Sequence, residues 1–438
     1  MTVDFSISAD WISSNNDSPE IRETSAFLTI QLGDYFATRA DDDWSKSVRT
    51  NVRVSAYPLA LWLASSWWRL RWEPTIEGTR SDRISWRMAH EMSAVGYGFI
   101  WPRLVFESDG ENIEATCHPS RPATSEPLRY LESFRVSISS KTFERSVDRF
   151  VSLVVARLET VGIRNSELQI LWNEIKEEKV DLATVEYRRF EAQLGFEPDE
   201  APESLLNSLI ALSSKVGNGA ILEVAPACSG EDPMASFQGI VNLAGVTGPE
   251  GKLEVPSSVT RVTRSSEFME DMPWERGRRL AHAARQAWGL GDSKLPDETF
   301  SEILGISKSN LEYTNDVQEH LPLGLAVRST KADKWKFIFR RKARTGRRFE
   351  AARLLGDRIV APAEDMWLPT TDAKTVRQKI QRAFAAEFLC PIKSLKYWLQ
   401  DNYSSESIEE AGEHFGVSPL AIRSHLANHG LIQYAEVG

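Results

Sequence analysis

The period of the apolar residues changes near residue 140, and this change restricts the chain to a mixed α+β fold. Before it, apolar and polar residues alternate in the stretches 27–32, 52–57 and 103–108, as in strands with one buried face. After residue 141 the apolar residues recur at spacings of three and four, as in helices with one buried face. We therefore predict a β-rich α+β domain over residues 1–136 and a helical domain or connector over 137–246.

The first of these domains is rich in tryptophan, with eight of the fourteen in the chain. Large aromatic side chains pack well in a core, and they also form platforms on which ligands or nucleic-acid bases stack. We favour core packing, because it is the commoner use of tryptophan.

The length of 438 residues exceeds what one hydrophobic core supports, so further domains are expected. The helical part has predicted helices at 166–177, 182–194 and 203–216, and it contains no pattern of catalytic residues. A stretch rich in Pro, Gly, Ser and Thr follows at 247–267 and is predicted to be a linker. The remainder, 268–438, forms a third domain, so the fold class is multidomain α+β.

Composition restricts the cellular compartment in which the protein is expected. Three cysteines, Cys117, Cys228 and Cys390, lie far apart, which argues against a disulfide framework and against a cysteine zinc site. No apolar run reaches the length of a membrane span, and the N-terminus has no basic region followed by an apolar core. We therefore expect a cytoplasmic protein without membrane contact.

Positive charge is concentrated in one segment of this acidic chain. Residues 331–358 carry eleven Lys/Arg and three acids, a net charge of +8, whereas the whole chain has −10. The segment begins with two strands of a predicted antiparallel hairpin, 324–330 and 334–342, and continues into a helix at 344–360. Alternation places Trp335, Phe337 and Phe339 on one face of the second strand.

Basic residues interleaved with aromatics suit a nucleic-acid backbone. The alternative is a solvated strand edge whose arginines pair with the acidic remainder of the chain. The candidate nucleic-acid-binding residues are Lys334, Lys336, Arg340, Arg341, Lys342, Arg344, Arg347 and Arg348, together with Arg423 near the C-terminus.

The order of elements after residue 271 resembles the ImmA/IrrE family of zinc-dependent endopeptidases. A helix ending RQAWGL is followed by ETFSEILGI, and a strand pair leads into TGRRFEAARLLGD, where the family has a similar lead-in to its HELGH helix. RAFAAEFLCP resembles the family's NxFAAxLLMP block, and SIEEAGEHFGVSPLAIRSHLANHGLI resembles its C-terminal tail. The resemblance covers about 271–438, roughly two fifths of the chain, and implies a zincin-like α+β domain.

The resemblance also locates the catalytic positions, and this sequence lacks their chemistry. Two histidines at i and i+4 on a helix bind zinc together, and the residue after the first supplies a carboxylate base. The first histidine corresponds to Arg353, the glutamate to Leu354 and the second histidine to Asp357. The third ligand falls at or beside Ile380. We therefore predict no catalytic residue, no metal and no cofactor.

Other histidines offer little as replacement ligands. His90 and Glu91 begin HEMSA, which lacks a second histidine. His425 and His429 have i, i+4 spacing, but His429 precedes a capping glycine, and we predict that neither binds metal. Arg353 and Asp357 are expected to form an intrahelical ion pair that fills the space of the metal.

The tail has the spacing of a helix-turn-helix. Ser407 and Glu410 have the pattern of a capping box, and Ser418 with Pro419 is typical of the start of a second helix. A helix that recognises a DNA sequence needs polar side chains to contact the bases. Arg423, Ser424 and Asn428 are polar residues on that helix. Four glutamates make the first helix acidic, which opposes binding to phosphates. In the resembled family this tail is often a packing or dimer element.

We therefore expect a catalytically inactive, ImmA/IrrE-like bacterial regulatory or phage-defence protein that binds a partner protein, nucleic acid, or both. One alternative is a zinc-dependent endopeptidase with an unusual or partner-completed active site. Another is a helix-turn-helix DNA-binding transcriptional regulator.

Overall fold

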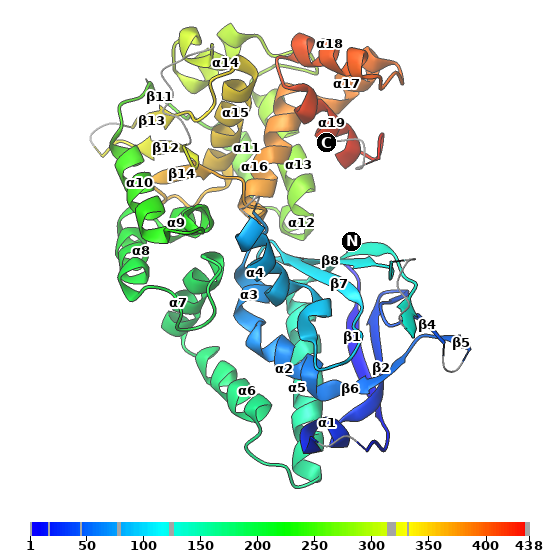
Figure 1. Cartoon of the computed structure of the whole chain (residues 1–438). Helices are drawn as coiled ribbons and strands as arrows, with labels where there is room; N and C mark the ends of the chain where they lie inside the picture. The colour runs from blue at the N-terminus through cyan, green and yellow to red at the C-terminus, as the bar shows by residue number, and fades with distance from the viewer. Residues whose placement is uncertain are drawn as a thin grey trace. The chain divides into compact units, whose positions relative to one another are not determined.

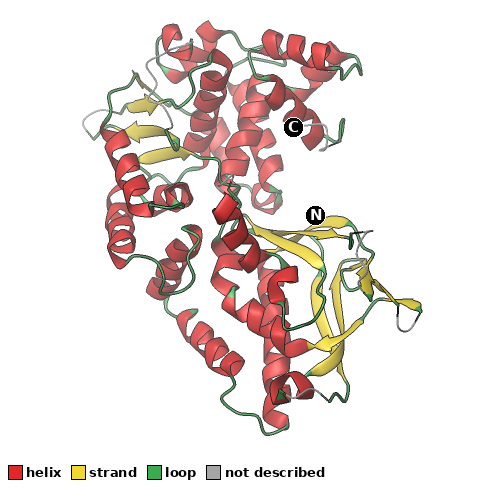
Figure 2. Cartoon of the chain, in the orientation of Figure 1, coloured by secondary structure: helices red, strands yellow, loops and turns green. Residues whose placement is uncertain are grey.

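The computed structural model describes residues 2–15, 18–43, 46–76, 80–121, 127–312, 321–330 and 333–433, without the side chains of 80–83 (Figure 1). The fold is mixed α+β, as predicted, and each half combines helices with β-sheet (Figure 2). The chain divides into two compact units, Met1–Leu206 and Asn207–Gly438, and the division falls within one helix, α8.

Unit 1 contains three small antiparallel sheets and seven α-helices among its described residues before α8. One sheet is formed by β1 (Phe5–Trp11), β2 (Ser25–Leu32), β3 (Tyr35–Phe36) and β6 (Val52–Ser55); a second by β7 (Arg103–Ser108), β8 (Asn112–His118) and β10 (Phe134–Ser139); a third by β4 (Ala40–Asp42), β5 (Ser47–Arg49) and β9 (Leu128–Tyr130). The helices are α1 (Pro19–Glu23), α2 (Ala56–Ser65), α3 (Trp67–Trp72), α4 (Arg80–His90), η1 (Met92–Val95), α5 (Ser140–Thr160), α6 (Glu167–Glu178) and α7 (Leu182–Gln193).

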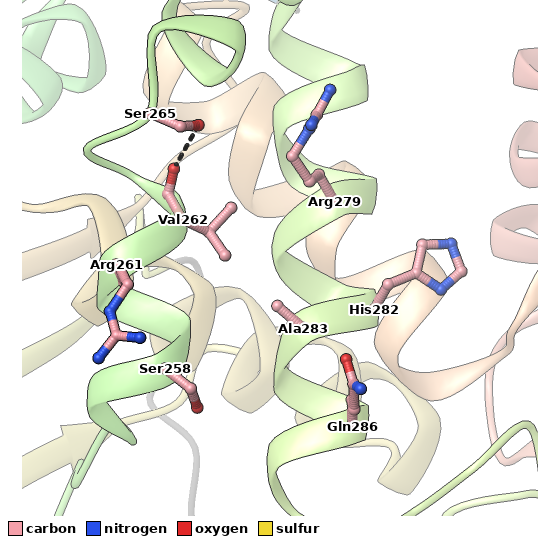
Figure 3. Close-up of a pocket in the computed structure, with 8 residues that line it drawn as sticks. All are labelled: Ser258, Arg261, Val262, Ser265, Arg279, His282, Ala283 and Gln286. Atoms are coloured by element: carbon pink, nitrogen blue, oxygen red, sulfur yellow. Dashed lines mark hydrogen bonds between the residues drawn. The ribbon is translucent and has the colours of Figure 1, made fainter.

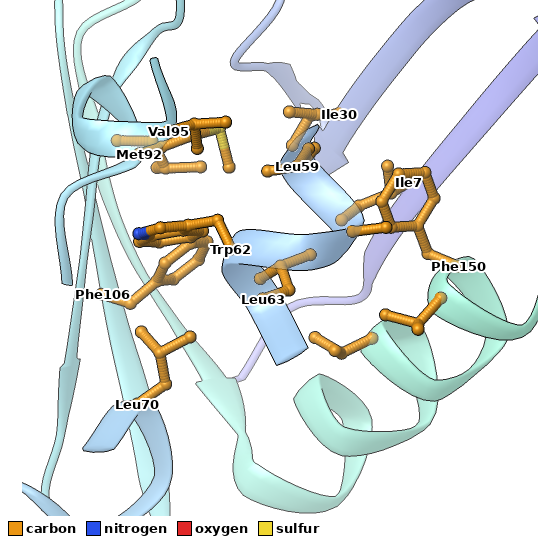
Figure 4. Packing of buried hydrophobic residues seen from close by; sticks show 14 of the residues in the cluster. Ile7, Ile30, Leu59, Trp62, Leu63, Leu70, Met92, Val95, Phe106 and Phe150 are labelled. Atoms are coloured by element: carbon orange, nitrogen blue, oxygen red, sulfur yellow. The ribbon is translucent and has the colours of Figure 1, made fainter. Parts of the chain in front are cut away.

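One hydrophobic core joins the sheets of unit 1 to its helices. Leu28, Ile30 and Leu32 of β2 are fully buried on one face of the strand. Phe143 and Phe150 of α5 are buried in the same cluster, whose centre is drawn in Figure 4. Because strands and α5 share this core, the observed division of the chain does not follow the predicted boundary at 136.

The tryptophans of unit 1 mostly pack in this core, as we favoured. Trp62, Trp67, Trp68 and Trp101 are at most 8% exposed, and Trp67 meets Trp172 of α6 edge to face at 5.5 Å. Trp44 lies outside the described residues. Within the described part of the chain, no helix combines the length and the apolar character needed to cross a membrane.

Unit 2 contains a four-stranded antiparallel sheet covered by helices. The sheet has the order β11 (Glu250–Gly251), β13 (Trp335–Ile338), β12 (Gly324–Arg328) and β14 (Trp367–Thr370). The helices are α8 (Glu203–Val216), α9 (Asn218–Val224), η2 (Ala225–Cys228), α10 (Pro233–Gly245), α11 (Ser257–Val262), α12 (Ser266–Glu270), α13 (Pro273–Ala287), α14 (Asp297–Leu304), η3 (Lys308–Leu311), α15 (Arg344–Val360), α16 (Val376–Leu389), α17 (Ile392–Leu399), α18 (Ser405–Phe415) and α19 (Pro419–Asn428).

The predicted hairpin forms, since β12 pairs with β13 in antiparallel register, and α15 has the predicted bounds. The stretch 247–267 differs from its prediction as a linker. It contains β11, which pairs with β13, and Leu253 and Val259 are buried in the core of unit 2. Two apolar side chains are enough to anchor a stretch whose composition is otherwise typical of a loop.

Helix α16 packs against α13 on one side and α15 on another (Figure 1), and glycines allow the close approach. A Cβ atom on Gly277 of α13 would lie 2.5 Å from the carbonyl oxygen of Ile380. A Cβ on Gly356 of α15 would lie 2.6 Å from the ring of Phe384. Real Cβ atoms do not approach other heavy atoms so closely, so both helices need glycine here.

Replacing Gly277 with alanine is expected to destabilise unit 2 by about 1–3 kcal/mol, because the added methyl group meets backbone atoms of α16 that cannot rotate away. Gly239→Ala is the matched control, since Gly239 is also helical but has nothing within 4 Å of its Cβ position. That control should be neutral or more stable by up to about 1 kcal/mol. Urea denaturation followed by circular dichroism measures both, and equal midpoints for the two variants would contradict the packing argument.

Candidate functional site

The four positions that correspond to catalytic residues of the resembled family are all buried in unit 2. Arg353, Leu354 and Asp357 lie on α15, and Ile380 lies on α16, with exposed fractions of 5% or less. Leu354 and Ile380 belong to the hydrophobic core. At the position that the resemblance assigns to the general base, the side chain is apolar.

Arg353 spans the space between α15 and α16. Its guanidinium donates to the backbone oxygen of Thr371 at 2.7 Å and to the side-chain oxygen of Gln378 on α16. Burial lowers the pKa of Arg353 well below its ordinary value, and the nearby cations Arg382 and Arg340 lower it further. This shift expresses the cost of keeping a cation away from water.

Asp357 pairs with α16 and not with Arg353, so the predicted intrahelical ion pair is wrong. Its two carboxylate oxygens accept hydrogen bonds from Arg377, at 2.6 and 2.9 Å. A third nitrogen of Arg377 donates to Asp365 at 2.6 Å. The fully buried carboxylate of Asp357 selects Arg377 because its planar guanidinium offers two parallel N–H donors.

A glutamate from α9 completes the network. Glu223 accepts hydrogen bonds from the hydroxyl of Thr375 and, at 2.9 Å, from the amide of Gln378. Burial raises the pKa of Glu223, although Arg377 and the two hydrogen bonds oppose the shift. The set of Glu223, Arg353, Asp357, Asp365, Arg377 and Gln378 is called the α15–α16 polar network below.

A surface depression lies elsewhere in unit 2. It measures about 410 Å³ and is lined by residues of α11 and α13, including Arg261, Arg279 and His282 (Figure 3). None of its lining residues belongs to the α15–α16 polar network. It therefore lies apart from the positions that the resemblance marks as catalytic.

Most side chains of the predicted basic surface make their contacts inside unit 2. Arg347 and Arg348 are buried, at 7% and 1% exposure. Arg347 donates to the backbone oxygen of Asn310 at 2.8 and 2.6 Å. Arg348 pairs with Asp297 and donates to the backbone oxygens of Leu295 and Gly416. The structure thus corrects their assignment as phosphate-binding residues.

Other predicted cations are also paired. Arg340 forms a bidentate ion pair with Asp372 at 2.7 and 2.8 Å, and Lys336 donates to the backbone oxygen of Ala244 at 2.7 Å. Arg344 pairs with Asp297 at 2.7 Å but keeps its side chain 45% exposed. Lys334 and Arg341 are exposed, and Lys342 is partly exposed.

The aromatic face of the second hairpin strand is internal. Trp335, Phe337 and Phe339 are at most 6% exposed. Arg358 lies over the ring of Trp335 and Arg347 over that of Phe339, at 5.8 and 4.7 Å from the ring centres. These rings pack in the core and present no stacking platform for bases.

The tail forms the predicted pair of helices, with a different first cap. Ser404, not Ser407, caps α18 by accepting from the backbone N–H of Ser407. Ser418 caps α19, as predicted. Arg423 donates to the hydroxyl of Ser405 at 2.9 Å, and α19 packs against α16, so the second helix is used for internal packing.

Sequence reasoning missed most of the polar network. Gln378 and Arg377 lie within two or three positions of Ile380, where the resemblance places its third ligand. Glu223 lies far away in the chain, in a segment without a recognisable motif, and only the tertiary fold brings it to Gln378.

No family model, no curated protein and no solved structure matches this chain.

Asp357→Asn is expected to destabilise unit 2 by about 3–5 kcal/mol, because it leaves the buried guanidinium of Arg377 without half of its compensating charge. The matched control is Glu298→Gln, which removes a carboxylate from an exposed ion pair with Lys308 on the same unit. That control should leave the denaturation midpoint unchanged. If the midpoint for Asp357→Asn equals that of the control, the ion pair between Asp357 and Arg377 does not stabilise unit 2.

Proposed function

We propose that this protein is a catalytically inactive ImmA/IrrE-like protein that acts by binding a partner protein. The observation that carries the proposal is the guanidinium of Arg353, buried between α15 and α16 and held by Thr371 and Gln378. In the resembled family this is the position of a zinc ligand. A guanidinium has only N–H donors and no lone pair to offer, so it cannot serve as a ligand to a metal ion.

The neighbouring positions support the same proposal. Asp357 has both carboxylate oxygens bound by Arg377, and Leu354 offers no group to accept a proton from water. Hydrolysis of a peptide bond needs an activated water and a base within hydrogen-bonding reach. The α15–α16 polar network supplies neither, and it rigidifies a scaffold of packed helices.

The setting that the resemblance implies is bacterial regulation or phage defence beside helix-turn-helix repressors. A scaffold without catalysis contributes to such a system through binding alone. The partner is therefore expected to be a protein that recognises the folded surface and remains intact on contact.

The purified chain should not cleave an unstructured polypeptide such as reduced casein, with or without added Zn²⁺. Asp357→Asn should leave its zinc content unchanged, because Asp357 is saturated by Arg377. Mass spectrometry of the casein and elemental analysis of the protein measure the two outcomes. Chelator-sensitive cleavage, with zinc lost in Asp357→Asn, would instead establish the endopeptidase alternative.

Nucleic-acid binding is a second candidate function, and fewer residues support it than the sequence suggested. Lys334, Arg341 and Arg344 remain exposed near the start of β13 and of α15, and exposed cations attract phosphates without reading sequence. The internal packing of α19 disfavours the alternative of a sequence-specific DNA reader.

If this surface binds nucleic acid, the triple variant Lys334→Ala, Arg341→Ala, Arg344→Ala should bind duplex DNA or single-stranded RNA more weakly. The slope of the logarithm of the binding constant against the logarithm of the salt concentration should also become less steep. The change should be about one unit for each phosphate that the variant no longer neutralises. Fluorescence anisotropy at several salt concentrations measures both. The control removes three exposed cations elsewhere in unit 2, Lys215, Arg261 and Lys393. Equal affinities for the two variants would remove the basic segment from the mechanism.

A further inference from the structure

Three potential metal ligands converge where α19 packs against α16. Glu387 lies in the last turn of α16, His425 in the last turn of α19, and His429 at the C-cap of α19. One side-chain ligand atom from each residue lies within 4.8 Å of the other two. The residues come from separate parts of the sequence, and the packing of α19 on α16 brings them together.

The converging atoms are buried and lack hydrogen-bond partners. Glu387 and His425 are 1% and 4% exposed. No described residue forms a hydrogen bond with Oε2 of Glu387 or with Nε2 of either histidine. A buried polar atom without a partner costs about 1–3 kcal/mol. The atoms of the two histidines each lie within ion-pair distance of Oε2 of Glu387 without forming a hydrogen bond to it, and a shared ligand would satisfy all three.

The spacing of these atoms suits a tetrahedral metal ion. Nε2 of His425 lies 3.3 Å from Oε2 of Glu387, and Nε2 of His429 lies 3.8 Å from it. Zinc bonds of about 2.0–2.2 Å place tetrahedral ligand atoms roughly 3.3–3.6 Å apart. Small side-chain rotations therefore bring all three atoms to bonding distance.

We propose that Glu387, His425 and His429 form a binding site for a divalent transition metal of the zinc class. Two imidazoles and one carboxylate are a ligand set that zinc accepts with one further position open. His282 of α13 stands beside this set, with Nε2 3.4 Å from Oε1 of Glu387 and a side chain that is 50% exposed. Figure 3 shows its ring on the side of α13 that faces away from α11.

His282 thus either orients the carboxylate of Glu387 from outside or fills the fourth position. The backbone N–H of Ile392 donates to the same oxygen of this carboxylate at 3.2 Å. Hydrogen bonds of this kind set the orientation of metal-binding carboxylates.

The site joins helices and has no catalytic base. Leu426 follows His425, at the place where a metallopeptidase helix has its glutamate. The metal would instead tie α19 to α16 and hold the tail on unit 2, since one ligand comes from α16 and two from α19. Such a site is independent of the α15–α16 polar network, and it goes beyond the proposed function.

The full chain, stripped with a chelator and titrated with ZnCl2 alone, is expected to bind one Zn²⁺ per chain and to melt at a higher temperature when bound. CoCl2 should give the visible absorption spectrum of four-coordinate Co²⁺. His429→Ala and Glu387→Gln should each weaken binding more than about 100-fold, and His282→Ala about 10–100-fold. Calorimetry measures the affinities, and circular dichroism checks that each variant is folded.

His414→Ala is the matched control, because His414 lies in the same tail but stacks on Trp398. It should bind Zn²⁺ like the wild-type chain, and so should Asp357→Asn, which separates this site from the α15 positions. The proposal is overturned if the folded wild-type chain takes up no stoichiometric Zn²⁺. It is equally overturned if His429→Ala and Glu387→Gln both bind as the wild type does.

Discussion

Unit 2 depends on the close approach of α16 to the two helices beside it. Gly277 brings the backbone of α13 against Ile380 and Ala383, and Gly356 brings α15 against Phe384. Backbones this close exclude water, so the buried polar groups of α16 depend on partners within the protein. At its first turn Arg377 and Gln378 meet the side chains of α15 and α9. At its last turn Glu387 meets the histidines of α19.

Burial also explains why the excess of positive charge in 331–358 does not make a basic surface. Removing a guanidinium from water costs several kcal/mol unless a carboxylate or several carbonyl oxygens compensate it. Arg340 and Arg348 each have a carboxylate partner, and Arg347 has backbone oxygens. The compensating acids Asp297 and Asp372 lie outside the segment in which the charge was counted. A local charge count therefore overestimates the field that a phosphate would meet outside the protein.

Local sequence patterns predicted much of the fold. They did not predict which side chains from different helices would pair with each other. The bounds of α15 and the β12–β13 hairpin follow from hydrophobic period and charge spacing, which act within a few residues. The predicted Arg353–Asp357 pair relied on the same local logic and was wrong, because α16 offers each residue a better-shaped partner. Glu223 was missed for a related reason, since nothing near it in the sequence indicates what it will contact. Ser404 caps α18 in place of Ser407 because the helix begins at Ser405, three residues earlier than the capping-box pattern indicated.

The two ends of α16 differ in what they offer a metal ion, and histidine spacing alone does not indicate this difference. The sequence test required an acid beside the first histidine, which is the requirement of a hydrolase and not of a metal site. At the first turn of α16, the buried carboxylates of Asp357 and Asp365 are already neutralised by Arg377, so a cation would have to displace a guanidinium. At the last turn, Oε2 of Glu387 faces the imidazoles of His425 and His429 at 3.3 and 3.8 Å. One end is therefore filled by a cation of the protein itself, whereas we propose that the other end holds a cation from outside.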